Sequence, residues 1–204
     1  MGIILADNSS SYTPLEEGVY MAVCNQIIDL GEQESTGQFG DRVVRQAFIQ
    51  WELPEEVVEV DGVEKPRRIG KTYNLSFNEK ATLRKDLENW RGRKFTEEEL
   101  RGFDLDNILG KGCQIQIIHT SKGDKVYDNV AGIMCLPRGM KLDPPAEVYS
   151  FVLEESRLDE IEAMPEWLQK RIKAGLTYQK LTETAFAQDE PAFDEADAPF
   201  GDLF

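Results

Sequence analysis

The chain has 204 residues and a formal net charge of −15, with 23 lysine and arginine side chains against 38 aspartate and glutamate side chains. This length allows one domain with a hydrophobic core plus an extension. The acidic balance argues against binding of nucleic acid through net charge alone, so the placement of the bases has to decide that point. The apolar run at residues 3–6 is too short for a signal peptide or a membrane span, and we expect no membrane partner.

Five segments show the alternation of side chains that is typical of half-buried β-strands. They follow a polar, flexible N-terminus at residues 1–12. In the first segment Val19, Met21 and Val23 share one face. Between the second and third segments, the Asp61-Gly62 pair predicts a hairpin turn within residues 55–68. The strands are predicted at residues 19–30, 42–53, 71–77, 113–119 and 125–134.

Helical signals separate the third strand from the fourth. Asn78 is a candidate N-cap, and Leu83, Leu87 and Trp90 fall on one face of the helix that follows. A second short helix is predicted from the capping-box match at residues 96–99. Three strands, a helical insert and two strands are the plan of the OB-fold, although a generic α+β sandwich has the same order. We therefore predict a mainly β domain at residues 13–136, a five-stranded OB-fold-like Greek-key barrel with a helix between strands three and four.

The C-terminal part of the chain has a different character. Residues 137–182 are predicted to form an extension that packs on the barrel or on a second copy of the protein, as in a homodimer. Its short helix begins at Pro165, directs Trp167, Leu168 and Ile172 inward, and ends at Gly175.

Residues 183–204 carry seven acids and no base, which leaves −8 on the rest of the chain. Their apolar side chains are mostly aromatic, so we expect a disordered acidic tail. Such a tail can compete with nucleic acid for a basic groove and can bind partner proteins, or it can be a solubilising segment. The candidate partner-binding residues are Asp197, Phe200, Asp202, Leu203 and Phe204.

The sequence contains none of the common catalytic constellations. Its single histidine, His119, has no recognisable base or metal partner, and the phosphate-loop, metalloprotease and serine-nucleophile motifs are missing. The cysteines Cys24, Cys113 and Cys135 are odd in number and lack a CxxC spacing, which argues against a zinc site or a disulfide framework and fits a reducing cytoplasm. We expect no enzymatic activity, no catalytic residue, no metal and no cofactor.

Basic residues gather in the segment 42–111, and aromatic residues are interleaved with them. Cations for phosphates and flat rings for bases are the combination that single-strand binders use. Phe48 and Tyr127 have polar neighbours on their own faces and are the better stacking candidates, whereas Trp51, Tyr73 and Phe77 are favoured as core. The predicted DNA-binding residues are Arg42, Arg45, Phe48, Arg67, Arg68, Lys71, Tyr73, Lys111, Lys125 and Tyr127.

Residues 71–119 resemble a group of small bacteriophage and prophage proteins with replication and recombination functions. The matching motifs are Trp51-Glu52-Leu53, Leu83-Arg84-Lys85-Asp86-Leu87, Trp90-Arg91-Gly92, residues 95–100 and Leu109-Gly110-Lys111. The resemblance extends over about residues 17–175, including the helix after Pro165. It implies an OB-fold single-stranded DNA-binding protein in the cytoplasm of a bacterial host, with an acidic tail that binds replication or recombination proteins. The alternative is a phage structural or assembly adaptor that does not bind DNA.

Overall fold

The computed structural model describes residues 13–37, 40–60, 62–123 and 125–188, without the side chains of residues 155 and 185–188. The described residues form two compact units. The first, which we call the barrel unit, contains the residues up to Ile28 together with Ala47–Ser150. The second unit contains Asp29–Gln46 and the residues from Phe151 onward. Strands β1 and β2 supply residues to both.

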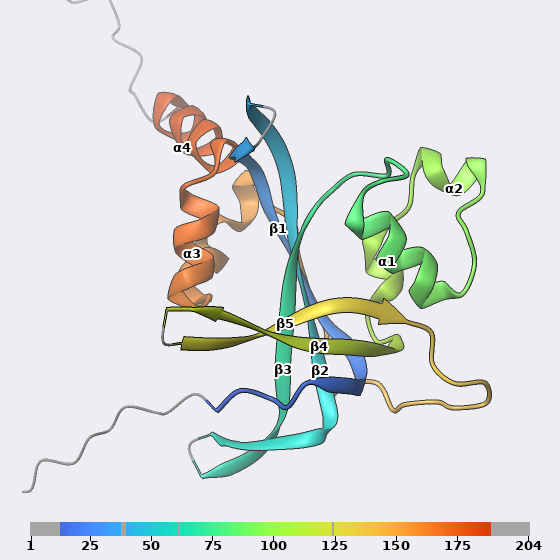
Figure 1. Ribbon diagram of the computed structural model, residues 1–204. Coiled ribbons are helices and arrows are strands. Elements are labelled where there is room, and N and C mark those ends of the chain that lie inside the picture. Colours follow the sequence, from blue (N-terminus) through green and yellow to red (C-terminus); the bar gives the residue numbers. More distant parts are fainter. Residues whose placement is uncertain (1–12, 38–39, 61, 124, 189–204) are drawn as a thin grey trace, which may run out of the picture. The chain divides into compact units, whose positions relative to one another are not determined.

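Five strands of the barrel unit form a nearly closed antiparallel barrel (Figure 1). Their order in the sheet is β3-β2-β1-β4-β5, and the edge strands β3 and β5 approach each other. In the register, Tyr20 of β1 faces Ile115 of β4, which in turn faces Ile133 of β5. The bounds are Gly18–Gly37 for β1, Gly40–Val60 for β2, Val63–Asn74 for β3, Gly112–Lys122 for β4 and Lys125–Met134 for β5.

The mainly β architecture with five barrel strands is thus confirmed, although β1 and β2 are much longer than the sequence pattern predicted. Strands β2 and β3 extend to either side of residues 61–62, so the predicted excursion at 55–68 is the end of one long hairpin. The alternation of apolar side chains ends near Leu53, because the hairpin beyond that point is exposed and its valines have no core to face.

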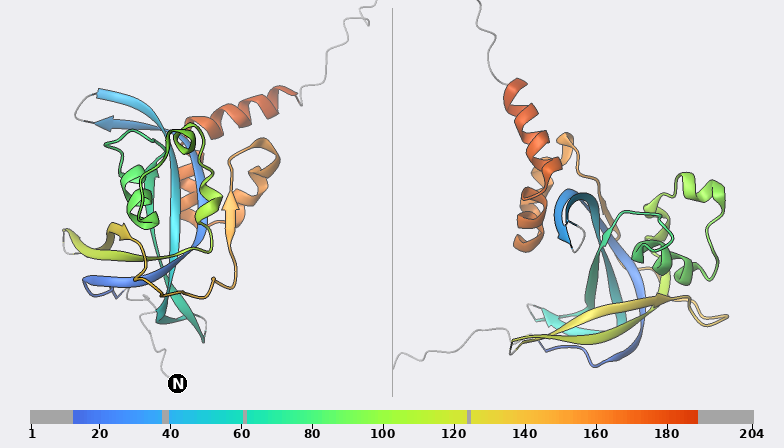
Figure 2. Two further views of the ribbon diagram at one scale, coloured as in Figure 1. Left: turned by 90° about the vertical axis from the view of Figure 1, so that its right-hand side faces the viewer. Right: turned by 45° about the horizontal axis from the view of Figure 1, so that its top comes forward.

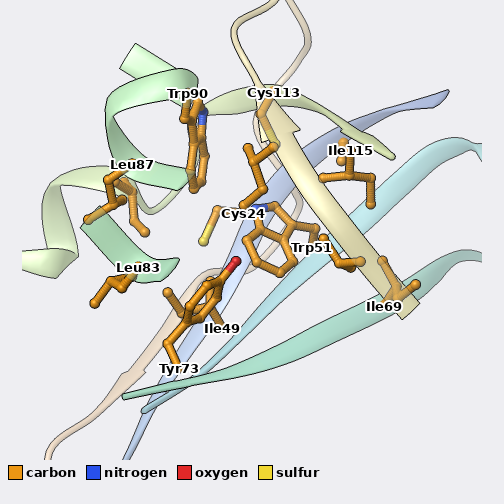
Figure 3. Packing of buried hydrophobic residues seen from close by; sticks show 14 of the residues in the cluster. Cys24, Ile49, Trp51, Ile69, Tyr73, Leu83, Leu87, Trp90, Cys113 and Ile115 are labelled. Atoms are coloured by element: carbon orange, nitrogen blue, oxygen red, sulfur yellow. The ribbon is translucent and has the colours of Figure 1, made fainter. Parts of the chain in front are cut away.

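The core lies inside the barrel, under the first helix. Side chains from β1, β2, β3, α1 and β4 point into one interior, as Figure 3 shows. Trp51 is completely buried and its ring lies 6.1 Å from that of Trp90, which confirms its predicted place in the core. The other large members are Ile49, Leu53, Tyr73, Leu83, Leu87, Phe95, Ile115, Ile117 and Ile133.

The helical insert between β3 and β4 contains α1 at Thr82–Arg91, α2 at Glu97–Arg101 and the 3-10 helix η1 at Leu105–Ile108. Helix α1 ends at Gly92 in the left-handed conformation, and Thr96 with Glu99 forms the predicted capping box of α2. Asn78 does not cap α1, which begins only after Ala81. Its side chain instead accepts a hydrogen bond from the Lys80 N–H in the preceding turn.

The second unit is mainly helical and surrounds the paired ends of β1 and β2. Its elements are the C-terminal part of β6 (Tyr149–Phe151), the 3-10 helix η2 (Glu155–Ala163), α3 (Glu166–Lys173) and α4 (Leu176–Gln188). Figure 2 shows α3 and α4 following one another. Gly31, with a φ of +70°, lies against Thr177 and Leu153, and the N–H of Glu32 donates to the Thr177 hydroxyl at 2.8 Å. These contacts fix the start of α4 on β1.

Two predictions for this region are wrong. Leu168 and Ile172 are buried as expected, but Trp167 is 50 % exposed, because it lies about 100° around α3 from its neighbour Leu168. Helix α4 continues to Gln188, so residues 183–188 are helical where the tail was expected to begin. The candidate partner-binding residues from Asp197 to Phe204 lie outside the described residues. No helix in the described part of the chain is long and apolar enough to cross a membrane.

Candidate nucleic-acid interface

On the outer face of β1, β2 and β3, the candidate Arg68 belongs to a hydrogen-bond network. Its guanidinium donates to the carboxylate of Glu52 at 2.7 and 3.0 Å. Glu52 is buried, and its carboxylate also accepts from the amide of Asn25, which in turn reaches Gln50. The Arg68 side chain is 53 % exposed, but its charge is compensated by the Glu52 carboxylate. That carboxylate has little contact with water.

Lys71 and Tyr73 point to the opposite side of β3 and meet α1. The ammonium of Lys71 and the hydroxyl of Tyr73 both donate to the Asp86 carboxylate, at 2.9 and 2.8 Å. Tyr73 is almost fully buried, and burial together with the nearby Asp86 charge raises its pKa above the ordinary value. This geometry engages both side chains within the barrel unit, and their contact with DNA stays a prediction. They fasten α1 to the barrel.

Arg67 is also engaged within the barrel unit. It donates to the carboxylate of Asp128 on β5 at 3.2 Å and to the backbone carbonyl of Thr13. Asp128 accepts the N–H of Leu15 as well, and a ring nitrogen of His119 lies 2.6 Å from the Leu15 carbonyl oxygen. The three side chains hold the N-terminal segment in place. Arg67 thus has a structural role in the barrel unit, and its contact with DNA stays a prediction.

Of the two candidates in the second unit, one is paired with a carboxylate and the other is exposed. Arg45 forms a two-point ion pair with Asp29, at 2.6 and 3.3 Å, and the hydrogen bond to that carboxylate raises the pKa of Arg45 above its ordinary value. Arg42, three residues earlier on β2, is exposed.

Phe48 is not available for stacking, contrary to the prediction. It does lie on the face opposite the core residues Ile49 and Trp51, but only 6 % of it is exposed. Its ring covers Gly70 of β3 so closely that a Cβ there would come within 2.1 Å of the ring. The neighbouring Gln46, taken as a sign of exposure, is itself buried. A glycine on the facing strand therefore provides the space for this ring, and the sequence of β2 alone contains no sign of it.

The β4–β5 hairpin does present the predicted combination of ring and charge. Its register places Tyr127 opposite Thr120, Lys125 opposite Lys122 and Asn129 opposite Ile118. Since Ile115 and Ile117 face the core, these six side chains point outward. Tyr127 is 44 % exposed, and both lysines are exposed. We call this surface the hairpin strip: Ile118, Thr120, Lys122, Lys125, Tyr127 and Asn129.

Lys122 was missed at the sequence level. It lies between the strands predicted at residues 113–119 and 125–134, whereas β4 continues to Lys122 and its two-residue spacing from Ile118 and Thr120 places it on the outward face. Lys111 is exposed at the other end of β4, just before its first residue. The ten candidates therefore do not form one groove. The structure brings Lys125 and Tyr127 together and directs Arg67, Arg68, Lys71 and Arg45 to carboxylates.

Within the described residues, no group of three or more histidine, cysteine, aspartate or glutamate side chains is placed to hold a metal ion. The chain matches no protein-family model, and the comparison with curated proteins finds no significant match.

Proposed function

We propose that the chain is a non-enzymatic single-stranded DNA-binding protein that acts in phage DNA replication or recombination in the bacterial cytoplasm. The arrangement of the barrel supports this. Strand β1 lies between β2 and β4, the edge strands β3 and β5 approach each other, and a helix lies between β3 and β4. We infer from this order the plan of the OB-fold, whose members bind oligonucleotides through strands two and three and through the loops after strands one and four.

The hairpin strip is the observation that carries the proposal. It lies on the hairpin that β4 and β5 form, beside the turn after the fourth strand, and it combines an exposed ring with two exposed lysines on one face. A tyrosine ring can stack on any unpaired base, and flanking ammonium groups can neutralise the adjacent phosphates. Stacking needs a base that is not already stacked in a duplex, so the strip favours single strands and has little sequence preference.

A second candidate function is an assembly adaptor that binds no DNA. The net charge of −15 favours it, and so does the pairing of Arg67, Arg68 and Lys71 with Asp128, Glu52 and Asp86. These cations offer a phosphate less than their number suggests, because each already has a carboxylate partner.

A titration of the full chain with fluorescent oligo-dT and with a duplex of equal length separates the two functions. We expect binding to oligo-dT to be much the tighter, and to weaken as salt rises from low to moderate concentration because counterions are released. Binding that prefers the duplex, or that does not depend on salt, contradicts the proposal, and the absence of any binding favours the adaptor.

We assign the acidic tail a regulatory and recruiting role within the same function. Its seven acids are tethered to the chain and compete with DNA at high effective concentration. Removal of residues 189–204, which hold six of these acids, should therefore raise the affinity for oligo-dT, and the gain should shrink as salt screens the competition. Replacing Phe204 by alanine should abolish capture of replication or recombination proteins. If truncation changes neither measurement, the tail is a solubilising segment.

A further inference from the structure

A pocket of about 320 Å³ lies where α1, η1 and the start of β4 meet, at the opposite end of β4 from the tip of the hairpin strip. It is lined by Trp90, Arg91, Phe103, Asn107, Ile108 and Lys111. Two cations, one amide and two aromatic rings thus surround one hollow. Its volume is at the lower end of the range for ligand pockets, which suits a single small unit rather than an oligomer.

The backbone holds Lys111 firmly at the edge of this pocket. Its carbonyl accepts the N–H of Cys24 at 3.1 Å, and the Cys24 carbonyl accepts the N–H of Gly110 at 2.8 Å. Gly110 has a φ of +69°, and a Cβ on Gly112 would come within 2.8 Å of Leu136. The left-handed conformation favours glycine at position 110, and at position 112 a larger residue would have to displace the Leu136 side chain. Since the Lys111 side chain is exposed, the result is a fixed backbone that presents a free ammonium group.

Arg91 adds charge that its surroundings compensate only in part. Its guanidinium lies over the rings of Phe95 and Phe103, at 4.3 and 5.3 Å from their centroids, and donates through Nη2 to Glu99. Glu99 also accepts two hydrogen bonds from Arg93, so two guanidinium groups share one carboxylate. Among the described residues, the Nη1 atom of Arg91 has no hydrogen-bond acceptor. Arg91, Arg93 and Glu99 taken together therefore carry one net positive charge at the edge of the pocket.

The remaining walls suit a flat ligand. The indole N–H of Trp90 donates to the Gly112 carbonyl at 2.8 Å, which fixes its ring, and Phe103 is only partly buried. Two acids at the start of η1 accept hydrogen bonds from neutral donors and keep their negative charges. Asp104 accepts the N–H of Asp106 at 2.9 Å, and Asp106 accepts the hydroxyl of Ser150 at 2.6 Å.

We propose that this pocket binds one nucleotide unit of a single strand, with its phosphate at Lys111 and Arg91 and its base against Phe103. The inference rests on the proposed function and adds a second contact point to it. Arginine and lysine are the side chains that bind phosphate, an aromatic ring accepts the face of any base, and the amide of Asn107 can pair with a base edge. Together with the hairpin strip, the pocket makes both ends of β4 contact points for the same strand.

A titration of the full chain with the mononucleotide 5′-dTMP tests the pocket, with thymidine and inorganic phosphate as separate arms. The probes are the NMR signals of the Trp90 indole N–H, the Asn107 amide and the Lys111 backbone N–H. We expect saturable shifts of these signals with 5′-dTMP, at an affinity roughly tenfold above that of either fragment, because charge and stacking contribute together. Lys111→Gln should weaken the binding of 5′-dTMP about tenfold. Lys94→Gln removes an exposed lysine that does not line this pocket and should leave binding unchanged.

Three results would overturn the inference: no shift at the three probes, equal shifts with phosphate alone, or equal effects of the two lysine variants. Binding of oligo-dT that depends on Tyr127 but not on Lys111 would keep the proposed function and reject the pocket. A chain that binds no oligo-dT at all would reject the proposed function, while the mononucleotide arm would still decide whether the pocket takes a nucleotide.

Discussion

The β2–β3 side of the barrel and the β4–β5 hairpin carry the same sequence signal and use it differently. Both combine basic and aromatic residues on strands whose side chains alternate between two faces. On β2 and β3, Arg68 and Lys71 meet buried carboxylates, and Phe48 is covered. On the hairpin, Lys125 and Tyr127 remain at the surface. A base is available to a phosphate only where the fold has not already provided it with an acid, so the number of bases in a segment says little about binding.

The largest expected effect is a loss of stability on the β2–β3 side of the barrel, at Trp51. Trp51→Ala should lower the free energy of unfolding by about 3–5 kcal/mol, because the indole is completely buried in the barrel and its removal leaves a cavity. Guanidinium denaturation followed by circular dichroism measures this, with Tyr127→Ala as the exposed control. A loss below about 1 kcal/mol would place Trp51 outside the core and undo the assignment of faces on β2.

The ion pair under α1 should come next. Asp86→Ala removes the acceptor of both Lys71 and Tyr73, and we expect a loss of about 3 kcal/mol, because the ammonium keeps its charge in a largely buried place. The double variant Lys71→Met/Asp86→Leu should recover part of this loss, since an apolar pair replaces the buried charges while the buried Tyr73 hydroxyl still lacks its acceptor. Denaturation of the single and double variants measures both. If Asp86→Ala instead changes DNA affinity and leaves stability alone, β3 belongs to the interface.

Replacement of Tyr127 tests the β4–β5 hairpin, where the ring is exposed. Tyr127→Ala should weaken binding of oligo-dT by about 1–3 kcal/mol, because one stacking surface is lost, and should leave the thermal midpoint unchanged. Phe48→Ala is the matched change on β2 and should lower stability by about 3–5 kcal/mol, since its ring is buried against Gly70. The reverse pattern, with Phe48 needed for affinity and Tyr127 for stability, would reverse the roles of the two regions.

The salt dependence sharpens the comparison further. Lys122→Gln and Lys125→Gln should each reduce the slope of log affinity against log salt by roughly 0.7, because each removes one phosphate contact. Arg68→Gln, on β3, should leave the slope unchanged, since the guanidinium of Arg68 is already paired with the Glu52 carboxylate. Fluorescence titrations at four salt concentrations give the slopes. Equal changes in all three variants would mean that pairing with a carboxylate does not remove a cation from binding.

The smallest expected effect is the pH dependence that comes from Glu99, whose carboxylate pairs with two arginines. Hydrogen bonds from Arg93, from the Thr96 N–H and from Arg91 lower the pKa of this carboxyl to about 2 from its ordinary 4.5. Because the pKa is lowered by folding, the stabilisation is present above about pH 4.5 and is lost as the pH falls toward 2. A carboxyl-detected NMR titration should give this midpoint, with fraying of α2 over the same range. Titration near 4.5 would mean that Arg91 and Arg93 are not held by Glu99.

The sequence by itself determined the local features of this protein. The presence and order of the five strands, the face of α1 that carries Leu83 and Leu87 and the capping box at Thr96 all follow from neighbours within a few residues, and the structure has each of them, although β1, β2 and β3 have other bounds than predicted. Backbone hydrogen bonding and side-chain periodicity are local, so a sequence pattern is sufficient to predict them.

Only the tertiary structure decided which bases and rings are free. Arg67 meets Asp128, which is 61 residues away, and Phe48 is covered because a glycine stands on the facing strand. Conversely, the register of β4 with β5 places Lys122, which lies between the two predicted strands, beside Lys125 on an outward face. Ion pairing and burial depend on groups that the fold brings together from distant parts of the chain, and for this reason the composition of one segment could not reveal them.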